Sequence, residues 1–289
     1  MSGTVPSLAL ISAFLSAAAT ILIRYGLQRY GPYTGVWINV MVGAVGLWVA
    51  VLVTGGMGHP SPRSLALFVL AGLIGTVAGR MLRFLAIEAV GASISAGFMN
   101  LTPLVSSGLA ILLLGERVTL PIVAGTLVIV FGTMLLSTGG RSLGVRPVLL
   151  WLPALSATCF GVVAILRKVG LSGAAPVPGA AVNVSTALVV FTAFLLASGQ
   201  ARVMRCSGRS LFYFVVAGLA ENLSVFLVIL ALSMGAVSVV APLTNVAPIF
   251  VLLLSAIFLR GIEMLNARVI GGVLLIVVGA SLITALGGR

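Results

Sequence analysis

Hydrophobic residues occupy the chain in long runs, and short polar connections separate the runs. Ten runs of about 20 residues can be drawn, at residues 6–27, 34–54, 65–87, 91–114, 119–138, 147–167, 177–198, 210–232, 235–258 and 266–286. A helix of about 20 residues rises about 30 Å, which matches the hydrocarbon core of a bilayer. The pattern therefore predicts an all-α membrane protein with ten transmembrane helices.

The pattern of residues repeats when the chain is compared with itself at an offset of 144 to 147 residues. The matches occur in order: Asn39 with Asn183, Asn100 and Pro103 with Asn245 and Pro248, Glu116 with Glu263, and Gly125 and Gly132 with Gly272 and Gly279. We therefore divide the chain into two homologous halves, residues 1–140 and 141–289.

Each half contains five predicted helices. Because five is an odd number, the second half enters the membrane from the opposite side, and the two halves form an inverted repeat. Inverted repeats are a recurring basis for alternating access in secondary transporters, in which the substrate is held near the bilayer midplane. The topology therefore favours a transporter.

Composition supports a membrane location and removes most other classes of function. Of the 289 residues, 61% are hydrophobic and only 7% are charged, too few to cover the surface of a soluble domain. The net charge of +12 comes from basic residues placed between the apolar runs, where they can anchor the helices to anionic lipid. We therefore expect the bilayer, and not nucleic acid, as the partner of these charges.

The sequence offers little for enzymatic chemistry. All four acidic residues are glutamates, and the chain has one histidine and two cysteines. It has neither a zinc-protease pair of histidines nor a phosphate-binding loop. We expect no enzyme activity, no cofactor, no bound metal and no direct use of ATP.

One segment of each half resembles a known family. Residues 103–132 combine a proline-bearing helix, a Gly115-Glu116-Arg117 turn and a glycine-spaced helix, and residues 248–279 are similar but lack the arginine. The pattern resembles the EamA repeat of the drug/metabolite transporter superfamily. The resemblance implies a ten-helix carrier with a central cavity lined mainly by the first, third and fourth helices of each half. That family exports amino acids, drugs and varied metabolites.

Glu221 is the strongest candidate for a substrate or proton site, because it falls at the midpoint of the eighth predicted helix, next to Asn222. A charge at that depth costs several kcal/mol unless it faces a cavity or a partner. Arg80 lies near the centre of the third helix, and symmetry places it close to Glu221. The two could bind the carboxylate and ammonium of a zwitterion, or Glu221 could form a structural ion pair with an arginine of the third helix. Arg83 lies near a membrane edge, where we expect it to extend toward the headgroups.

Four asparagines and two prolines complete the candidate site. The asparagines recur as repeat pairs inside predicted helices, where an amide lines a cavity or joins helices: Asn39 with Asn183, and Asn100 with Asn245. Pro103 and Pro248 fall within predicted helices, where a proline frees a carbonyl and bends the backbone. We predict that Asn100 and Asn245, with the two prolines, lie at similar depth on opposite sides of a central cavity.

These features together predict a secondary transporter that exports small metabolites, such as amino acids or other zwitterionic solutes, with protons as a possible coupling ion. Two alternatives remain: a flippase or carrier for a lipid-linked or phosphorylated anion, and a membrane subunit that does not transport. We expect a monomer or weak homodimer, multi-pass in the inner (plasma) membrane.

The orientation in the membrane is left open by the charges. With cytoplasmic termini, five basic residues would lie inside and nine outside, so the positive-inside rule favours external termini. The family resemblance implies cytoplasmic termini, and we follow it here.

Overall fold

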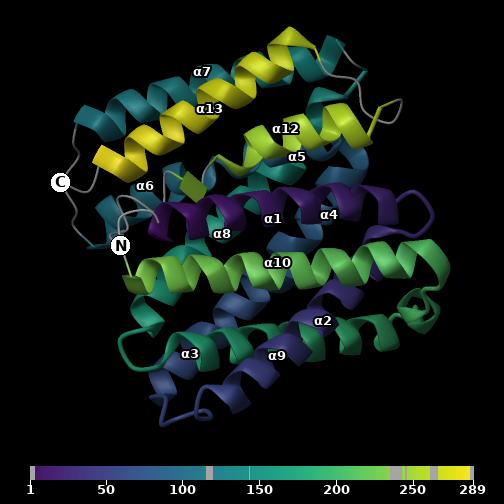
Figure 1. The fold of residues 1–289 in the computed structure, drawn as a ribbon, viewed down its shortest axis with the longest axis vertical. Helices are drawn as coiled ribbons and strands as arrows, with labels where there is room; N and C mark the ends of the chain where they lie inside the picture. Colours follow the sequence, from purple (N-terminus) through teal and green to yellow (C-terminus); the bar gives the residue numbers. More distant parts are fainter. Residues whose placement is uncertain are drawn as a thin grey trace.

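The protein is a bundle of apolar helices, as the ribbon in Figure 1 shows. The computed structural model describes residues 4–114, 120–142, 144–234, 243–244, 246–260 and 266–286. No strand occurs within these ranges. The fold class predicted from the hydrophobic runs is therefore confirmed as all-helical.

The first half contains five of the predicted runs. Its elements are α1 (Thr4–Gly26), α2 (Pro32–Val53), α3 (Pro62–Ala71), the π-helix η1 (Gly72–Gly79), α4 (Arg80–Val90), α5 (Ala92–Met99), α6 (Thr102–Leu114) and α7 (Leu120–Ser142). Two of these runs are divided into shorter elements, the third into α3, η1 and α4 and the fourth into α5 and α6. The segments α3, η1 and α4 follow one another without a gap and form one span, Pro62–Val90.

The second half has the same order of long helices. Its elements are the 3₁₀ turn η2 (Pro147–Leu150), α8 (Trp151–Gly170), α9 (Pro176–Ala197), the 3₁₀ turn η3 (Ala201–Met204), α10 (Gly208–Met234), α12 (Ala247–Phe258) and α13 (Ala267–Leu286). Six helical spans in the described residues are long and apolar enough to cross a membrane, and three shorter apolar helices accompany them. The protein is thus multi-pass, although the count of ten spans is not confirmed by these lengths.

The prediction of one unbroken helix over residues 91–114 is wrong. The segment is divided between α5 and α6, and Asn100 caps the C-terminus of α5. The corresponding segment of the second half also contains a non-helical residue, Val246, directly before α12. Apolar character alone could not predict these ends, because both sides of each break are equally hydrophobic.

The expected proline kinks inside helices are a second correction. Pro103 is the second residue of α6, and Pro248 lies in the first turn of α12. A proline is well tolerated there, because the first N–H groups of a helix have no intrahelical acceptor and the ring already holds a helical φ. The prolines therefore begin new helices and do not bend existing ones.

Helices α7 and α13 form a seam along one end of the molecule, while α2 and α9 lie toward the other end (Figure 1). The seam contacts are reciprocal. A Cβ on Gly132 would lie 2.9 Å from the carbonyl oxygen of Gly272, and a Cβ on Gly279 would lie 2.7 Å from that of Gly125. These four glycines correspond in pairs at an offset of 147. Each half therefore presents the same small-residue face to the other, as in a two-fold contact.

The π-helix η1 fits closely against the second half. A Cβ added to Gly75 would lie 2.8 Å from Val163 of α8, and one added to Gly79 would lie 3.1 Å from Cys159. Ser156 of α8 donates a hydrogen bond of 2.8 Å to the carbonyl oxygen of Gly79. Glycine and this serine together hold the start of α4 against α8, and Arg80 is the first residue of α4.

Candidate functional site

The centre of the candidate site is an ion pair between α4 and α10. Glu221 is the middle residue of α10, and its Oε1 lies 2.5 Å from Nη1 of Arg83. The two side chains are only 12% and 11% exposed. A carboxylate at this depth requires a partner, and Arg83 provides it. The pair joins α4 of the first half to α10 of the second.

Arg83 does not extend to the membrane edge, so that expectation was wrong. Its Nη2 donates a hydrogen bond of 2.9 Å to Oγ1 of Thr20 on α1. The Thr20 hydroxyl donates in turn to the carbonyl oxygen of Ser16, at 2.9 Å. A buried threonine can thus accept from a guanidinium while its own proton stays bonded within the helix. Thr20 orients Arg83 toward Glu221.

Asn39 of α2 links the ion pair to Arg80. Its Nδ2 donates to Oε2 of Glu221 at 3.2 Å, and its Oδ1 accepts from Nη1 of Arg80 at 2.6 Å. Asn39 is fully buried. Both oxygens of Glu221 are therefore occupied, one by Arg83 and one by Asn39. The expected pairing of Arg80 with Glu221 is present only through this amide.

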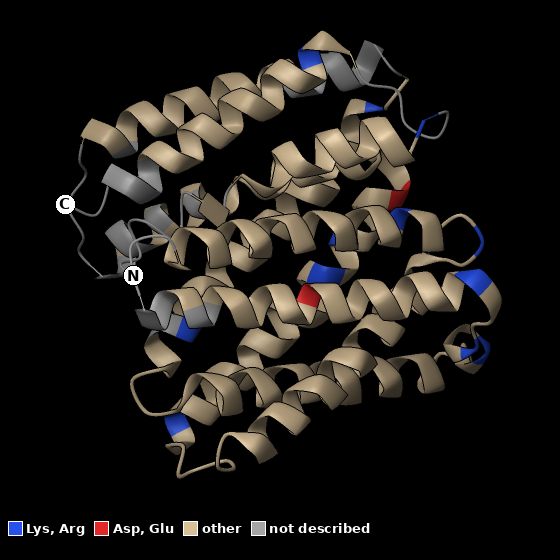
Figure 2. Cartoon of the chain, in the orientation of Figure 1, with Lys and Arg blue, Asp and Glu red and all other residues tan. Residues whose placement is uncertain are grey.

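Figure 2 places most charged residues near the ends of the helices, but acidic and basic residues also lie side by side in the middle of the bundle. The central group contains Glu221, Arg83, Arg80 and Asn39, which we call the charge cluster. It draws on α2, α4 and α10, and through Thr20 on α1. Within the membrane-spanning helices, the charge cluster therefore connects the two halves of the chain.

The other predicted asparagines lie in different surroundings. Asn183 is fully buried, and its Oδ1 accepts a hydrogen bond of 2.7 Å from Thr76 of η1. Asn222 donates to the Gly218 carbonyl oxygen within α10, at 2.6 Å, and packs next to Gly43. Asn100 is 7% exposed at the end of α5. Asn245 lies outside the described residues, so its predicted symmetry with Asn100 stays a prediction.

Sequence reasoning did not select Thr20 or Thr76, although each bonds to a predicted site residue. The usable signal was weak: both are hydroxyl side chains within apolar runs, and such residues commonly bond to their own helix. The repeat gives a second signal, because Asn39 and Asn183 correspond and each joins its helix to the third helix of a half. Only the structure distinguishes a carboxylate partner, Glu221, from a hydroxyl partner, Thr76.

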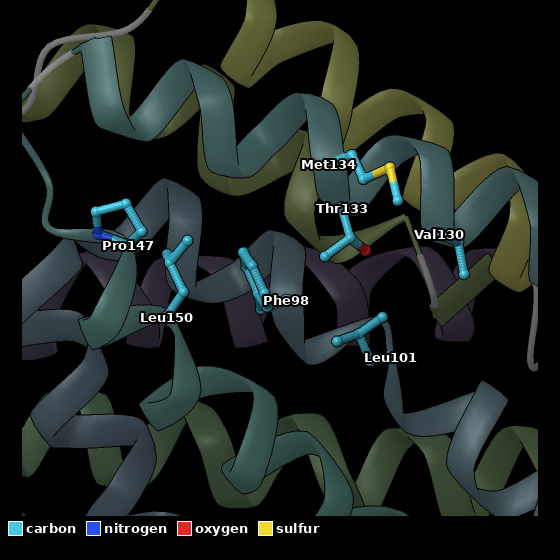
Figure 3. Close-up of a pocket in the computed structure, with 7 residues that line it drawn as sticks. All are labelled: Phe98, Leu101, Val130, Thr133, Met134, Pro147 and Leu150. Carbon is cyan, nitrogen blue, oxygen red and sulfur yellow. The ribbon is translucent and has the colours of Figure 1, made fainter.

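A separate cavity of about 690 Å³ lies between α5, η2 and α7. Its lining is mainly apolar: Phe98, Leu101, Val130, Thr133, Met134, Pro147 and Leu150. Figure 3 shows these side chains pointing into the space between the α5–α6 break and α7. No member of the charge cluster lines it. We place the candidate site at the charge cluster, because an apolar groove in a membrane protein is an ordinary contact for lipid chains.

The charge cluster can bind an ion or exchange a proton. A guanidinium is a permanent cation, and a carboxylate can be neutralised by a proton or re-paired with a cation. No group of three or more metal-ligating His, Cys, Asp or Glu side chains occurs in the parts of the chain that the structure describes. The charge cluster itself offers arginine, glutamate and amide groups.

Comparison with solved structures identifies the fold. Twenty-eight solved chains match significantly. One of them, a crystal structure, has a TM-score of 0.67 and 18% sequence identity, and the match covers 97% of this chain and 96% of that chain. At this identity, the likeness concerns the fold alone. Comparison with curated protein sequences gives no significant match.

Comparison with protein families is more specific. The EamA-like transporter family matches twice, at residues 4–138 and 147–285. The two matches together cover nearly the whole chain, and each corresponds to one set of the long helices described above. The chain belongs to the EamA-like transporter family.

Proposed function

We propose that this carrier exports a small organic solute, such as an amino acid or a related metabolite, by alternating access and without ATP. The observation that carries the proposal is the charge cluster at the middle of α10. Ionisable groups inside a membrane are costly and mark substrate or ion pathways. Here they join helices from both halves, where a relative movement of the halves would act on them.

The reciprocal glycine contacts of α7 and α13 support the inverted-repeat part of this proposal. Two halves related by a two-fold axis in the membrane plane can exchange conformations and open the same site to either side. In such a cycle, we expect the Arg83–Glu221 ion pair to break and re-form as the two halves move. A proton on Glu221 weakens its attraction for Arg83 and Asn39, and this couples the charge state of the carboxyl to the occupancy of the site.

Transport by purified protein in liposomes tests the proposal. We expect Glu221→Gln, which keeps the shape of the side chain but removes its charge, to abolish flux or its dependence on pH. Glu88→Gln is the matched control, because Glu88 is an exposed carboxyl at the end of α4. Normal flux and pH dependence in Glu221→Gln would make the ion pair structural.

A second function is favoured by the positive charge of the cluster, in which two arginines accompany one glutamate. A flippase for a lipid-linked or phosphorylated anion would use the same arginines. Flux of a water-soluble solute separates the first function from the second. A protein that gives no flux of either kind would fit the third alternative, a subunit that does not transport.

A further inference from the structure

The charge cluster carries an excess of positive charge, and Arg80 is the residue without a counter-ion. Arg83 has the carboxylate of Glu221 as its counter-ion, at 2.5 Å. Arg80 has only the neutral amide oxygen of Asn39, at 2.6 Å, and its Nε is buried without a hydrogen-bond partner. Arginine remains charged in proteins, so Arg80 cannot escape the cost of burial by losing a proton.

The charge cluster holds two guanidinium groups, those of Arg80 and Arg83, and one carboxylate, that of Glu221. Of the other glutamates, Glu88 is exposed at the end of α4, whereas Glu116 and Glu263 lie outside the described residues. Among the residues that the structure describes, no carboxylate makes an ion pair with Arg80.

We propose that Arg80 is an anion subsite and that the transported solute carries net negative charge, through a carboxylate or phosphate group. This inference rests on the proposed transport function and specifies its substrate class. A guanidinium with an unpaired Nε donor offers a planar, two-pronged match to a carboxylate or phosphate. The solute would then supply the counter-ion that the protein does not.

The same geometry removes the need for an ammonium group on the solute. Both oxygens of Glu221 are already engaged, by Arg83 and by Asn39. A zwitterion would have to share with its ammonium a carboxylate that Arg83 already neutralises, whereas a simple anion makes no such demand. This revises the expectation of a zwitterionic substrate that the sequence suggested.

The first test measures charge selectivity. Liposomes that contain the full-length protein are given a pool with equal numbers of anionic, zwitterionic and cationic organic solutes, and the solutes moved across the membrane are measured by mass spectrometry. A parallel assay follows a fluorescent anionic phospholipid, which distinguishes a lipid-borne anion from a soluble one. We expect anions to be moved preferentially. Preference for cations or zwitterions would overturn the anion subsite but leave transport intact, and movement of no solute or lipid would refute the proposed function itself.

The second test concerns Arg80 itself. We expect Arg80→Gln to reduce anion flux about 10- to 100-fold, which corresponds to the loss of one or two charge-assisted hydrogen bonds. Arg80→Lys keeps the charge without the planar fork and should retain an intermediate flux with the same charge preference. Arg63→Gln is the matched control, because Arg63 is exposed at the start of α3. Equal anion flux in wild type and Arg80→Gln would overturn the subsite, as would a reduction of the same size in Arg63→Gln.

Discussion

At the scale of single residues, the side chains of the charge cluster hold one another in place. Thr20 orients Arg83, Arg83 neutralises Glu221, and Asn39 holds both Glu221 and Arg80. Arg83, Glu221 and Asn39 each bond to a neighbouring side chain of the cluster. Removing one member therefore leaves another polar group buried without a partner, which is more costly than removing an interacting pair together.

This dependence predicts a strong coupling between Arg83 and Glu221. We expect Arg83→Gln and Glu221→Gln each to lower the free energy of unfolding by about 3–5 kcal/mol, because each leaves one buried charge unpaired. The double substitution should cost less than the sum of the two, by about 1–3 kcal/mol. Unfolding of the four proteins in detergent measures the coupling. Additive effects would mean that the two side chains do not interact in the folded protein.

At the scale of elements, the helix ends near Asn100 and before α12 are where sequence and structure differ most. Helix interiors were predicted well, because about 20 apolar residues in a row leave few alternatives in a membrane. The ends were not, because Pro103 and Pro248 are compatible both with a kink inside a helix and with the first turn of a new one. The direction in which Arg83 points was equally beyond the sequence, since a long side chain can extend to the headgroups or turn inward.

The placement of Pro248 in the first turn of α12 predicts a mild effect of substitution. We expect Pro248→Ala to change flux by less than about twofold, because no internal hydrogen bond of the helix depends on the missing N–H. Flux measured in liposomes, normalised to the amount of inserted protein, is the readout. A loss of tenfold or more would restore a gating role for this proline.

The α7–α13 seam predicts which glycines are indispensable for packing. A Cβ at Gly132 would lie 2.9 Å from a backbone oxygen, and the backbone cannot easily withdraw. We expect Gly132→Ala to destabilise the protein by about 1–3 kcal/mol, the usual cost of overpacking. Gly46→Ala is the matched control, because nothing lies within 4 Å of a Cβ at Gly46. It should be neutral or stabilising by up to about 1 kcal/mol. If Gly132→Ala and Gly46→Ala changed the thermal stability equally, the close packing of α7 against α13 would be contradicted.

At the scale of the whole molecule, the inverted repeat predicts that equivalent loops face opposite sides of the membrane. The turn after α2 and the turn after α9 correspond in sequence, and Figure 1 shows them at opposite ends of the bundle. The second of these connections contains Cys206. Met57, in the first, offers a matched position for a cysteine.

We expect a membrane-impermeant maleimide to label Cys206 or a cysteine introduced by Met57→Cys, but not both, in cells whose outer surface alone is exposed. Cys159 is replaced by serine in both proteins, and Cys206 is also replaced by serine in the protein that carries Met57→Cys. Burial raises the pKa of the Cys206 thiol, so its reactive thiolate form is scarcer at neutral pH and its labelling rate should still rise as the pH is raised above neutrality. Labelling of both cysteines from the same side would contradict the inverted arrangement.

The reciprocal seam between α7 and α13 also bears on how such a chain could arise and be divided. Because Gly132 faces Gly272, the counterpart of Gly125, and Gly125 faces Gly279, the counterpart of Gly132, the first half carries a surface that is complementary to a copy of its own α7. Two separate five-helix polypeptides could therefore meet through this seam without a connecting peptide. An ancestor made of paired short chains would need only gene fusion to become one polypeptide. The present chain, cut between α7 and η2, should reassemble from its two co-expressed pieces.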